Sequence, residues 1–96
     1  MLVHVAFTPG ERTPAPVGIV VDVLRATSTM TQALASGYER VLCCAEIDEA
    51  RKLAASEAPV VLAGERRLEH IEGFDFGNSP REVAEPPRAP TLVLTT

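Results

Sequence analysis

Apolar and polar residues alternate along the chain in blocks that predict a succession of strands and helices. Short runs rich in Val, Ile and Leu are typical of strands that are covered on both faces of a sheet. Such runs occupy residues 2–7, 17–23, 40–45, 59–63 and 91–95. The run 17–23, VGIVVDV, is the strongest of these strand predictions because β-branched residues dominate it.

Two segments between these runs have the apolar spacing of amphipathic helices, residues 25–36 and 46–56. Their inward-facing residues are expected to be Ala26, Met30, Ala33 and Leu34 in the first helix, and Ile47, Ala50, Leu53 and Ala54 in the second. Gly37 predicts the end of the first helix. Prolines place a loop at residues 8–16, and a long loop is expected from residue 64 to about 80, followed by a helical turn near 80–83.

Strands that alternate with helices of about ten residues predict an α/β fold. We expect an open, mostly parallel sheet with helices on both faces, in three layers, and a single domain over residues 1–96. Ligands of such sheets bind at the carboxyl ends of the strands. The loops after residues 23, 63 and 95 should therefore converge on one edge, where the chemistry is expected.

Composition narrows the function classes. The hydrophobic content of 46% argues against disorder. The net charge of −4 argues against binding to nucleic acid or to an acidic membrane. Without a membrane-length apolar run or a signal-peptide pattern at the N-terminus, a cytoplasmic location is expected. Cys43 and Cys44 are adjacent in an apolar run and are interpreted as small buried hydrophobes. His4 is assigned to packing and His70 to the surface.

The first polar loop follows the run 17–23 and opens the first helix. It contains Asp22, Arg25 and the hydroxyl residues Thr27, Ser28 and Thr29. A fixed guanidinium beside the unpaired N–H groups of a helix start is typical of an anion site. The alternative is structural: Asp22 satisfies backbone donors, and Thr27 or Ser28 only caps the helix. The glycines and the lysine of a Walker loop are absent.

Two further polar stretches lie at or after the strand at 59–63. Glu65 and Arg66, in GERR, could hold a metal and an anion, or could form only a solvated ion-pair cluster. In the stretch 72–80, Asp75 could ligate a hard cation, while Ser79 before Pro80 is typical of a helix start. The alternative for this stretch is a packed loop whose phenylalanines enter the core.

The strings VVDVLRATSTMTQALASG, LAGER, IEGFDFGNSP and TLVLTT occur in this order. Together they resemble the 2-phosphosulfolactate phosphatase family of coenzyme M biosynthesis. The resemblance implies an α/β enzyme that uses Mg²⁺ to hydrolyse the phosphate monoester of 2-phospho-3-sulfolactate to 3-sulfolactate and phosphate. The chain stops inside a motif that continues as T-x-N-G-T in the family. We therefore expect the N-terminal part of a longer phosphatase, inactive by itself.

The resemblance selects the residues that match these motifs, and their roles are inferred from their chemistry. The expected catalytic residues are Asp22, Arg25 and Ser28, and either Asp22 or Ser28 could be the nucleophile. The expected Mg²⁺ ligands are Asp22, Glu65 and Asp75. The expected substrate-binding residues are Thr27, Thr29, Arg66, Asn78, Ser79, Thr95 and Thr96.

Other functions stay open at this point. The chain could be a non-catalytic anion-binding or regulatory remnant, or a related phosphatase that acts on another small phospho-acid. It could also be a partly folded truncation product with no function of its own. The expected partner is a small anionic phosphorylated substrate, with no nucleic acid and no membrane, and a homo-oligomer stays open.

Overall fold

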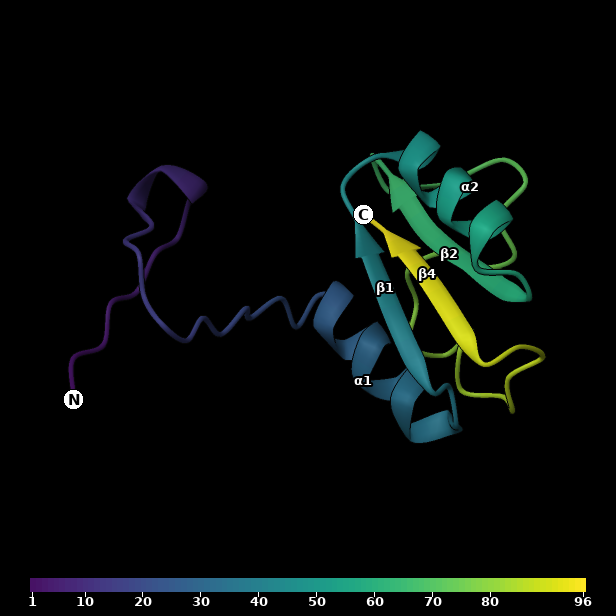
Figure 1. Ribbon diagram of the computed structural model, residues 1–96, viewed down its shortest axis with the longest axis horizontal. Helices are drawn as coiled ribbons and strands as arrows, with labels where there is room; N and C mark the ends of the chain where they lie inside the picture. Colours follow the sequence, from purple (N-terminus) through teal and green to yellow (C-terminus); the bar gives the residue numbers. More distant parts are fainter.

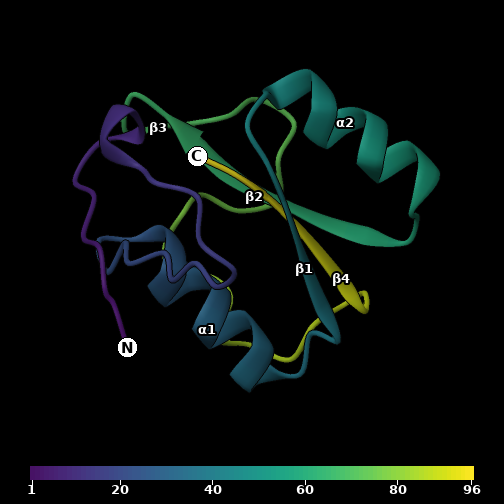
Figure 2. The same ribbon diagram turned by 60° about the vertical axis from the view of Figure 1, so that its left-hand side comes forward.

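The computed structural model describes residues 1–96 and contains one four-stranded sheet, in the order β1-β4-β2-β3. Figure 1 shows β1, β4 and β2 side by side, and Figure 2 shows β3. Its strands are β1 (Arg40–Cys44), β2 (Val60–Arg66), β3 (Glu69–His70) and β4 (Thr91–Thr95). Both β1 and β2 pair with β4 in parallel, and the short β3 pairs with β2 antiparallel. The mostly parallel sheet that the sequence predicted is confirmed.

Helices α1 (Ala26–Ser36) and α2 (Ile47–Ser56) cover opposite faces of the sheet (Figure 2). On one face, Ala33 of α1 joins Leu92 and Leu94 of β4 in the larger core cluster. On the other face, Ala50 of α2 packs in the same cluster as Val93 of β4. Neighbouring residues of a strand point to opposite faces, so β4 serves both cores, and the three-layer prediction is confirmed.

The helix ends follow the sequence closely. Gly37 adopts the left-handed conformation with φ of 111°, and its N–H caps the carbonyls of Ala33 and Leu34, which ends α1 as predicted. Asp48 and Glu49 lie in the first turn of α2, where carboxylates interact favourably with the helix dipole. Both helices begin one residue later than predicted.

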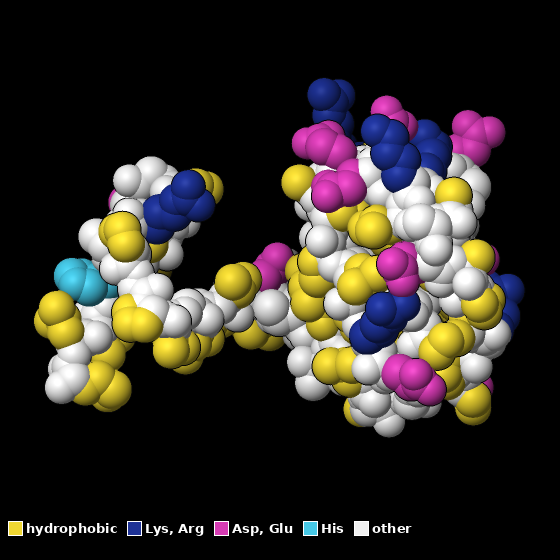
Figure 3. Space-filling model, viewed as in Figure 1, with side chains coloured by type: hydrophobic (Ala, Val, Ile, Leu, Met, Phe, Trp, Pro, Cys, Tyr) yellow, Lys and Arg dark blue, Asp and Glu magenta, His cyan; other side chains and the backbone are white.

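The predicted strands 2–7 and 17–23 are wrong. Residues 1–24 extend away from the sheet with only a short 3-10 turn, η1 (Pro9–Glu11), as Figure 1 shows. Their large apolar side chains are all exposed, from 62% for Val23 upward (Figure 3). His4, predicted to pack, is exposed with them. We call residues 1–24 the N-terminal arm.

The topology explains why the arm has no place in this sheet. Parallel strands are joined by right-handed connections, so connections through helices on opposite faces run in opposite directions across the sheet. The path from β1 through α2 to β2 passes β4. A strand at 17–23 that led through α1 into β1 would therefore belong on the β4 side of β1, which β4 itself fills. The outer edge of β2 is filled by β3 and by Asp75 and Phe76.

Smaller corrections concern the loops. Strand β2 continues through Gly64, Glu65 and Arg66, which were predicted to lie in a loop. The expected helix near 80–83 is only a series of turns. Cys43 is exposed and Cys44 is half-buried, so the prediction of two buried cysteines is wrong, although burial still raises the pKa of both thiols above the usual value. His70 is exposed, as predicted.

None of the helices is both long and apolar enough to cross a membrane. The longer of the two, α1, has 11 residues, which is short of the ~20 that a bilayer requires.

Candidate active site

Three of the predicted loops meet at the carboxyl edge of the sheet, around the Glu65 carboxylate near the end of β2. Oε2 of Glu65 accepts a hydrogen bond from Nη2 of Arg25 at 3.1 Å, and Oε1 accepts one from Nδ2 of Asn78 at 3.3 Å. The hydroxyl of Thr96 lies 3.5 Å from Oε1 and accepts from Nδ2 of Asn78 at 3.2 Å. We call Arg25, Glu65, Asn78 and Thr96 the Glu65 cluster.

The Glu65 cluster joins residues that are far apart in the sequence. Arg25 is the residue immediately before α1, Glu65 is in β2, and Asn78 comes from the loop after β3. Thr96 directly follows β4. The predicted convergence of these segments is therefore observed, because parallel strands bring their carboxyl ends to one edge.

Burial differs within the cluster. The Glu65 side chain is only 15% exposed and Asn78 only 2%, whereas the Arg25 side chain is 40% exposed. Oδ1 of Asn78 is buried without a hydrogen-bond partner. The guanidinium of Arg25 therefore faces solvent, while Glu65 and Asn78 behind it are largely buried.

Gly64 allows the two central strands to approach closely at this edge. A Cβ atom at position 64 would lie 2.0 Å from the carbonyl oxygen of Thr95, a separation that no side chain tolerates. Position 64 therefore requires glycine, the only residue without a Cβ atom.

Arg66 braces the sheet beside the cluster. Its Nη2 donates to the hydroxyl of Thr95 at 2.6 Å and also to the carbonyl of Ala45, after the end of β1. Its Nη1 donates to the carbonyl of Glu65 at 2.9 Å. Because three acceptors of the protein bind this guanidinium, Arg66 links β2 to β4 and to the end of β1. It also places a positive charge near the Glu65 cluster. The Ala45 carbonyl is a partner that no feature of the sequence indicated.

The hydroxyl residues at the start of α1 donate to main-chain carbonyls. Thr27 donates to Asp22 at 2.6 Å, Ser28 to Val23 at 2.7 Å, and Thr29 to Arg25 at 3.0 Å. None of them caps the helix through its side chain. They shape the turn that leads from the arm into α1, and this supports the structural reading of these residues more than direct contact with an anion.

The three predicted magnesium ligands do not come together. Asp75 makes no hydrogen bond with the cluster, since its Oδ1 accepts from Arg88 at 2.9 Å and its Oδ2 from the N–H of Leu62 at 2.8 Å. Asp22 lies in the arm, and its exposed carboxylate has no hydrogen-bond partner. No group of three His, Cys, Asp or Glu side chains is arranged to hold a metal ion. Only Glu65 of the predicted trio belongs to the cluster.

The loop from 72 to 80 combines two of the roles that its sequence suggested. Phe74 is buried in the smaller core cluster, and Phe76 packs against the larger one beneath Arg88, 5.5 Å from its ring centre. Asn78 then enters the Glu65 cluster. The side chain of Ser79 makes no hydrogen bond and starts no helix. The packed-loop alternative therefore describes the phenylalanines, while Asn78 lies at the carboxyl edge with Glu65.

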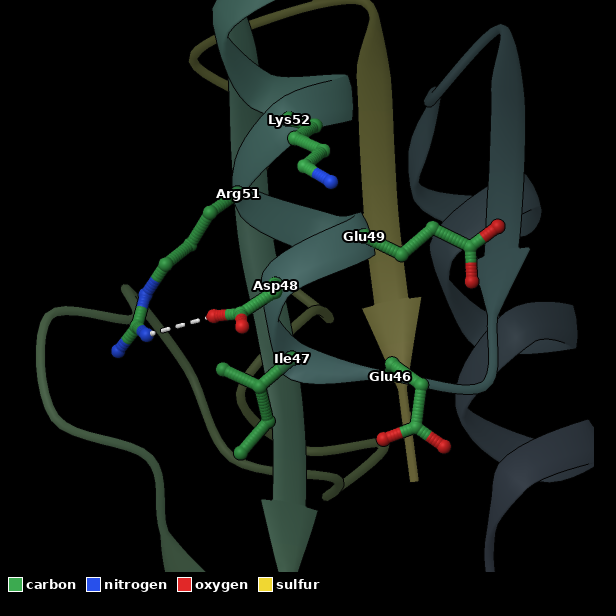
Figure 4. A pocket seen from close by; sticks show the side chains of 6 residues that line it. All are labelled: Glu46, Ile47, Asp48, Glu49, Arg51 and Lys52. Atoms are coloured by element: carbon green, nitrogen blue, oxygen red, sulfur yellow. Dashed lines mark hydrogen bonds and ion pairs between the residues drawn. The ribbon is translucent and has the colours of Figure 1, made fainter.

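Two hollows on the surface lie outside the cluster. One follows α1 from Thr27 to Ala35 and is also lined by Pro80 from the loop after β3. The other lies on the first turns of α2 (Figure 4). It is lined by Glu46, Ile47, Asp48, Glu49, Arg51 and Lys52. Asp48 already pairs with Arg51 at 3.4 Å, and the remaining carboxylates make this second hollow a poor site for an anion.

Comparison with known proteins places these motifs in a family. The model of the family described as 2-phosphosulpholactate phosphatase matches residues 3–96. A probable 2-phosphosulfolactate phosphatase of Clostridium acetobutylicum is 41% identical over 88 residues, which are 90% of this chain and 37% of that protein. One of Thermotoga petrophila is 40% identical over 96 residues, covering 99% of this chain and 41% of that protein.

A probable 2-phosphosulfolactate phosphatase of Caldanaerobacter subterraneus is 43% identical over 81 residues, which are 81% of this chain and 34% of that protein. The chain thus spans between about a third and two fifths of the length of these curated relatives. The match to the family model runs over nearly the whole chain and includes each segment of the Glu65 cluster. The chain belongs to the 2-phosphosulpholactate phosphatase family.

Proposed function

We propose that this chain is the part of a phosphatase that binds the phosphoryl group of a small phosphorylated acid. The observation that carries the proposal is the exposed guanidinium of Arg25, held 3.1 Å from Glu65 at the start of α1. A guanidinium presents several N–H donors in a plane, which suits phosphate oxygens, and the start of a helix adds further positive potential. Both features oppose the negative charge of the substrate.

The proposed substrate is 2-phospho-3-sulfolactate, as the names of the relatives suggest. A place in coenzyme M biosynthesis and a cytoplasmic location are proposed on the family resemblance and on the sequence alone. Water adds its oxygen to phosphorus, the ester P–O bond breaks, and the alkoxide that leaves takes up a proton from the water. The products are 3-sulfolactate and phosphate. Arg25 would offset the charge that collects on the phosphoryl oxygens.

Asp22 and Ser28 are the proposed candidates for the group that activates water or attacks phosphorus. Asp22 is the better candidate because its carboxylate is exposed and has no hydrogen-bond partner. The hydroxyl of Ser28, in contrast, already donates to the carbonyl of Val23 at 2.7 Å. Asp22 lies three residues before Arg25, at the same end of α1, where its backbone bonds to Thr27.

Magnesium dependence is proposed on the family resemblance alone. When bound, Mg²⁺ would polarise the phosphoryl oxygens. Of the expected ligands, Glu65 lies at the site and both of its oxygens already accept hydrogen bonds, while Asp22 and Asp75 lie elsewhere. The ligand set present in this chain does not fit a magnesium site, so the roles proposed here for the residues of the Glu65 cluster are limited to binding and orienting the phosphoryl group.

The deciding experiment measures phosphate release from 2-phospho-3-sulfolactate, with and without Mg²⁺. This chain is compared with a version extended to the full length of its relatives. Release by the extended protein, lost in Arg25→Ala, is the expected result. No release by well-folded extended protein would refute the assignment of this substrate, and release from other phospho-acids would favour the related phosphatase.

A second function is favoured by the position of the predicted ligands. Since Asp22 and Asp75 lie outside the Glu65 cluster, this chain by itself could bind an anion without hydrolysing the ester. Isothermal titration with inorganic phosphate tests this reading. Binding without turnover would identify the chain as an anion-binding module, and turnover by the 96-residue chain would exclude that.

A further inference from the structure

The Glu65 carboxylate has three partners within the protein. Oε2 faces the guanidinium of Arg25 at 3.1 Å, while Oε1 has the amide of Asn78 at 3.3 Å and the hydroxyl of Thr96 at 3.5 Å. The side chain is 15% exposed, so these contacts are shielded from water more than those of a surface ion pair. A cation at Glu65 would compete with these three contacts for the roughly four acceptor sites of the carboxylate, and it would face the positive charge of Arg25.

The arginine in this pair is held on one side only. A guanidinium has five N–H donors, and Glu65 is the one side-chain partner that the structure gives Arg25. The side chain is 40% exposed, so the remaining donors are open to solvent next to the first turn of α1. Glu65 thus fixes the guanidinium without using up its capacity to bind an anion.

Asn78 and Thr96 fix the carboxylate in turn. Asn78 is 2% exposed, and its amide donates both to Glu65 and to the hydroxyl of Thr96 at 3.2 Å. Two segments far apart in the sequence therefore orient Glu65 before any ligand is present. A binding group that is already oriented loses less entropy when the ligand arrives.

We infer that Glu65 is a positioning residue, which holds the guanidinium of Arg25 in the orientation that binds the phosphoryl group, and is not a metal ligand. This inference rests on the proposed phosphoryl site at Arg25. The role explains why a carboxylate lies within an anion site, where its own charge opposes binding. The contribution of Glu65 is then to orient Arg25, and that benefit exceeds the repulsion between the carboxylate and the anion.

The direction in which Glu65→Gln changes the affinity for inorganic phosphate separates orientation of Arg25 from charge repulsion. If Glu65 acted only through its charge, Glu65→Gln would remove a repulsion and tighten the binding of inorganic phosphate. If Glu65 positions Arg25, Glu65→Gln weakens binding, roughly tenfold, because an amide cannot hold the guanidinium as a carboxylate does. If Glu65 were a magnesium ligand, its substitution would change phosphate binding only when Mg²⁺ is present.

The experiment is isothermal titration of the whole chain with inorganic phosphate, in EDTA and again with excess Mg²⁺. The inference expects Glu65→Gln to raise Kd roughly tenfold in both buffers, and to have no further effect when Arg25→Ala is already present. The matched control is Glu57→Gln, which breaks the pair of Glu57 with Arg40 at the opposite end of the sheet. This control should leave Kd unchanged.

Failure of the inference and failure of the proposed function give different results. The phosphoryl site itself is refuted if the wild-type chain binds no phosphate, or if Arg25→Ala binds phosphate as tightly as the wild type. Wild-type binding that Glu65→Gln leaves unchanged or tightens refutes only the positioning role. Circular dichroism checks the fold, and if Glu65→Gln does not fold, Glu65→Asp replaces it, since the shorter side chain keeps the charge but should still weaken binding.

Discussion

Residues 17–23 of the N-terminal arm and strand β4 have similar apolar sequences, but the former are exposed and the latter is buried. Residues 17–23 are as apolar and β-branched as residues 91–95, yet Val20 is 80% exposed while Leu92 is completely buried. β4 lies between two parallel neighbours and under a helix on each face. The difference shows that an apolar run specifies a strand only where the topology provides neighbours for both of its edges and both of its faces.

The largest expected effect separates the two regions directly. Leu92→Ala removes a completely buried side chain from the centre of the sheet, and should lower the free energy of unfolding by about 2–5 kcal/mol. Val20→Ala in the arm should change it by less than about 0.5 kcal/mol. Urea titration followed by circular dichroism measures both. Equal losses in the two variants would show that the arm packs as a strand in solution.

A pair of glycine substitutions makes the same comparison at the backbone. Gly64→Ala places a Cβ against the carbonyl of Thr95 and should cost about 1–3 kcal/mol of stability, with a disturbed Glu65 cluster. Gly18→Ala in the arm meets no atom within 4 Å and should be almost neutral. The contact of Gly64 with Thr95 would be disproved by a Gly64→Ala protein as stable as the parent.

A smaller effect is expected at high pH, and only from the folded body. Burial raises the pKa of Tyr38 above 10.0; Arg88 lowers it and Asp75 raises it, but burial dominates. A raised pKa means that the unfolded state loses its proton first, so stability should be constant below about pH 10 and fall as the pH rises further. Tyr38→Phe should flatten this fall in denaturation curves measured between pH 9 and 11. An unchanged slope would show that Tyr38 titrates as in the unfolded chain.

The smallest effect is predicted for removing most of the arm. Deleting residues 1–21 leaves Asp22, whose backbone bonds to Thr27, and should change the free energy of unfolding by less than about 0.5 kcal/mol. The measurement is again urea denaturation, with the full-length chain as the reference. A marked loss of stability, or of the cooperative transition, would mean that the apolar arm is buried after all.

Much of the fold could be predicted from local patterns. The two helices, the ends set by Gly37, and the strands β1, β2 and β4 were all predicted within a few residues. These features depend on periodicity, on burial of one face and on glycine conformation, which act over a few neighbouring residues. The convergence of Arg25 with Glu65 also followed, because the rule that parallel strands end at one edge requires no knowledge of strand order.

What the sequence could not provide depends on contacts between distant segments. The strand at 17–23 failed because its neighbours depend on strand order and on the handedness of connections, neither of which a single run encodes. The partners of Asp75, namely Arg88 and the backbone of Leu62, removed it from the expected metal site through contacts that no spacing predicts.

The sequence by itself determined the two helices, the strands β1, β2 and β4, and the segments whose ends meet at the carboxyl edge, since these follow from local periodicity and from the parallel arrangement of strands. Only the tertiary structure decided that Glu65 faces Arg25, Asn78 and Thr96, that Arg66 joins β2 to β4 and the end of β1, and that the arm stays outside the sheet. Those outcomes depend on which distant side chains meet at hydrogen-bonding distance, and strand order and packing settle that for the chain as a whole.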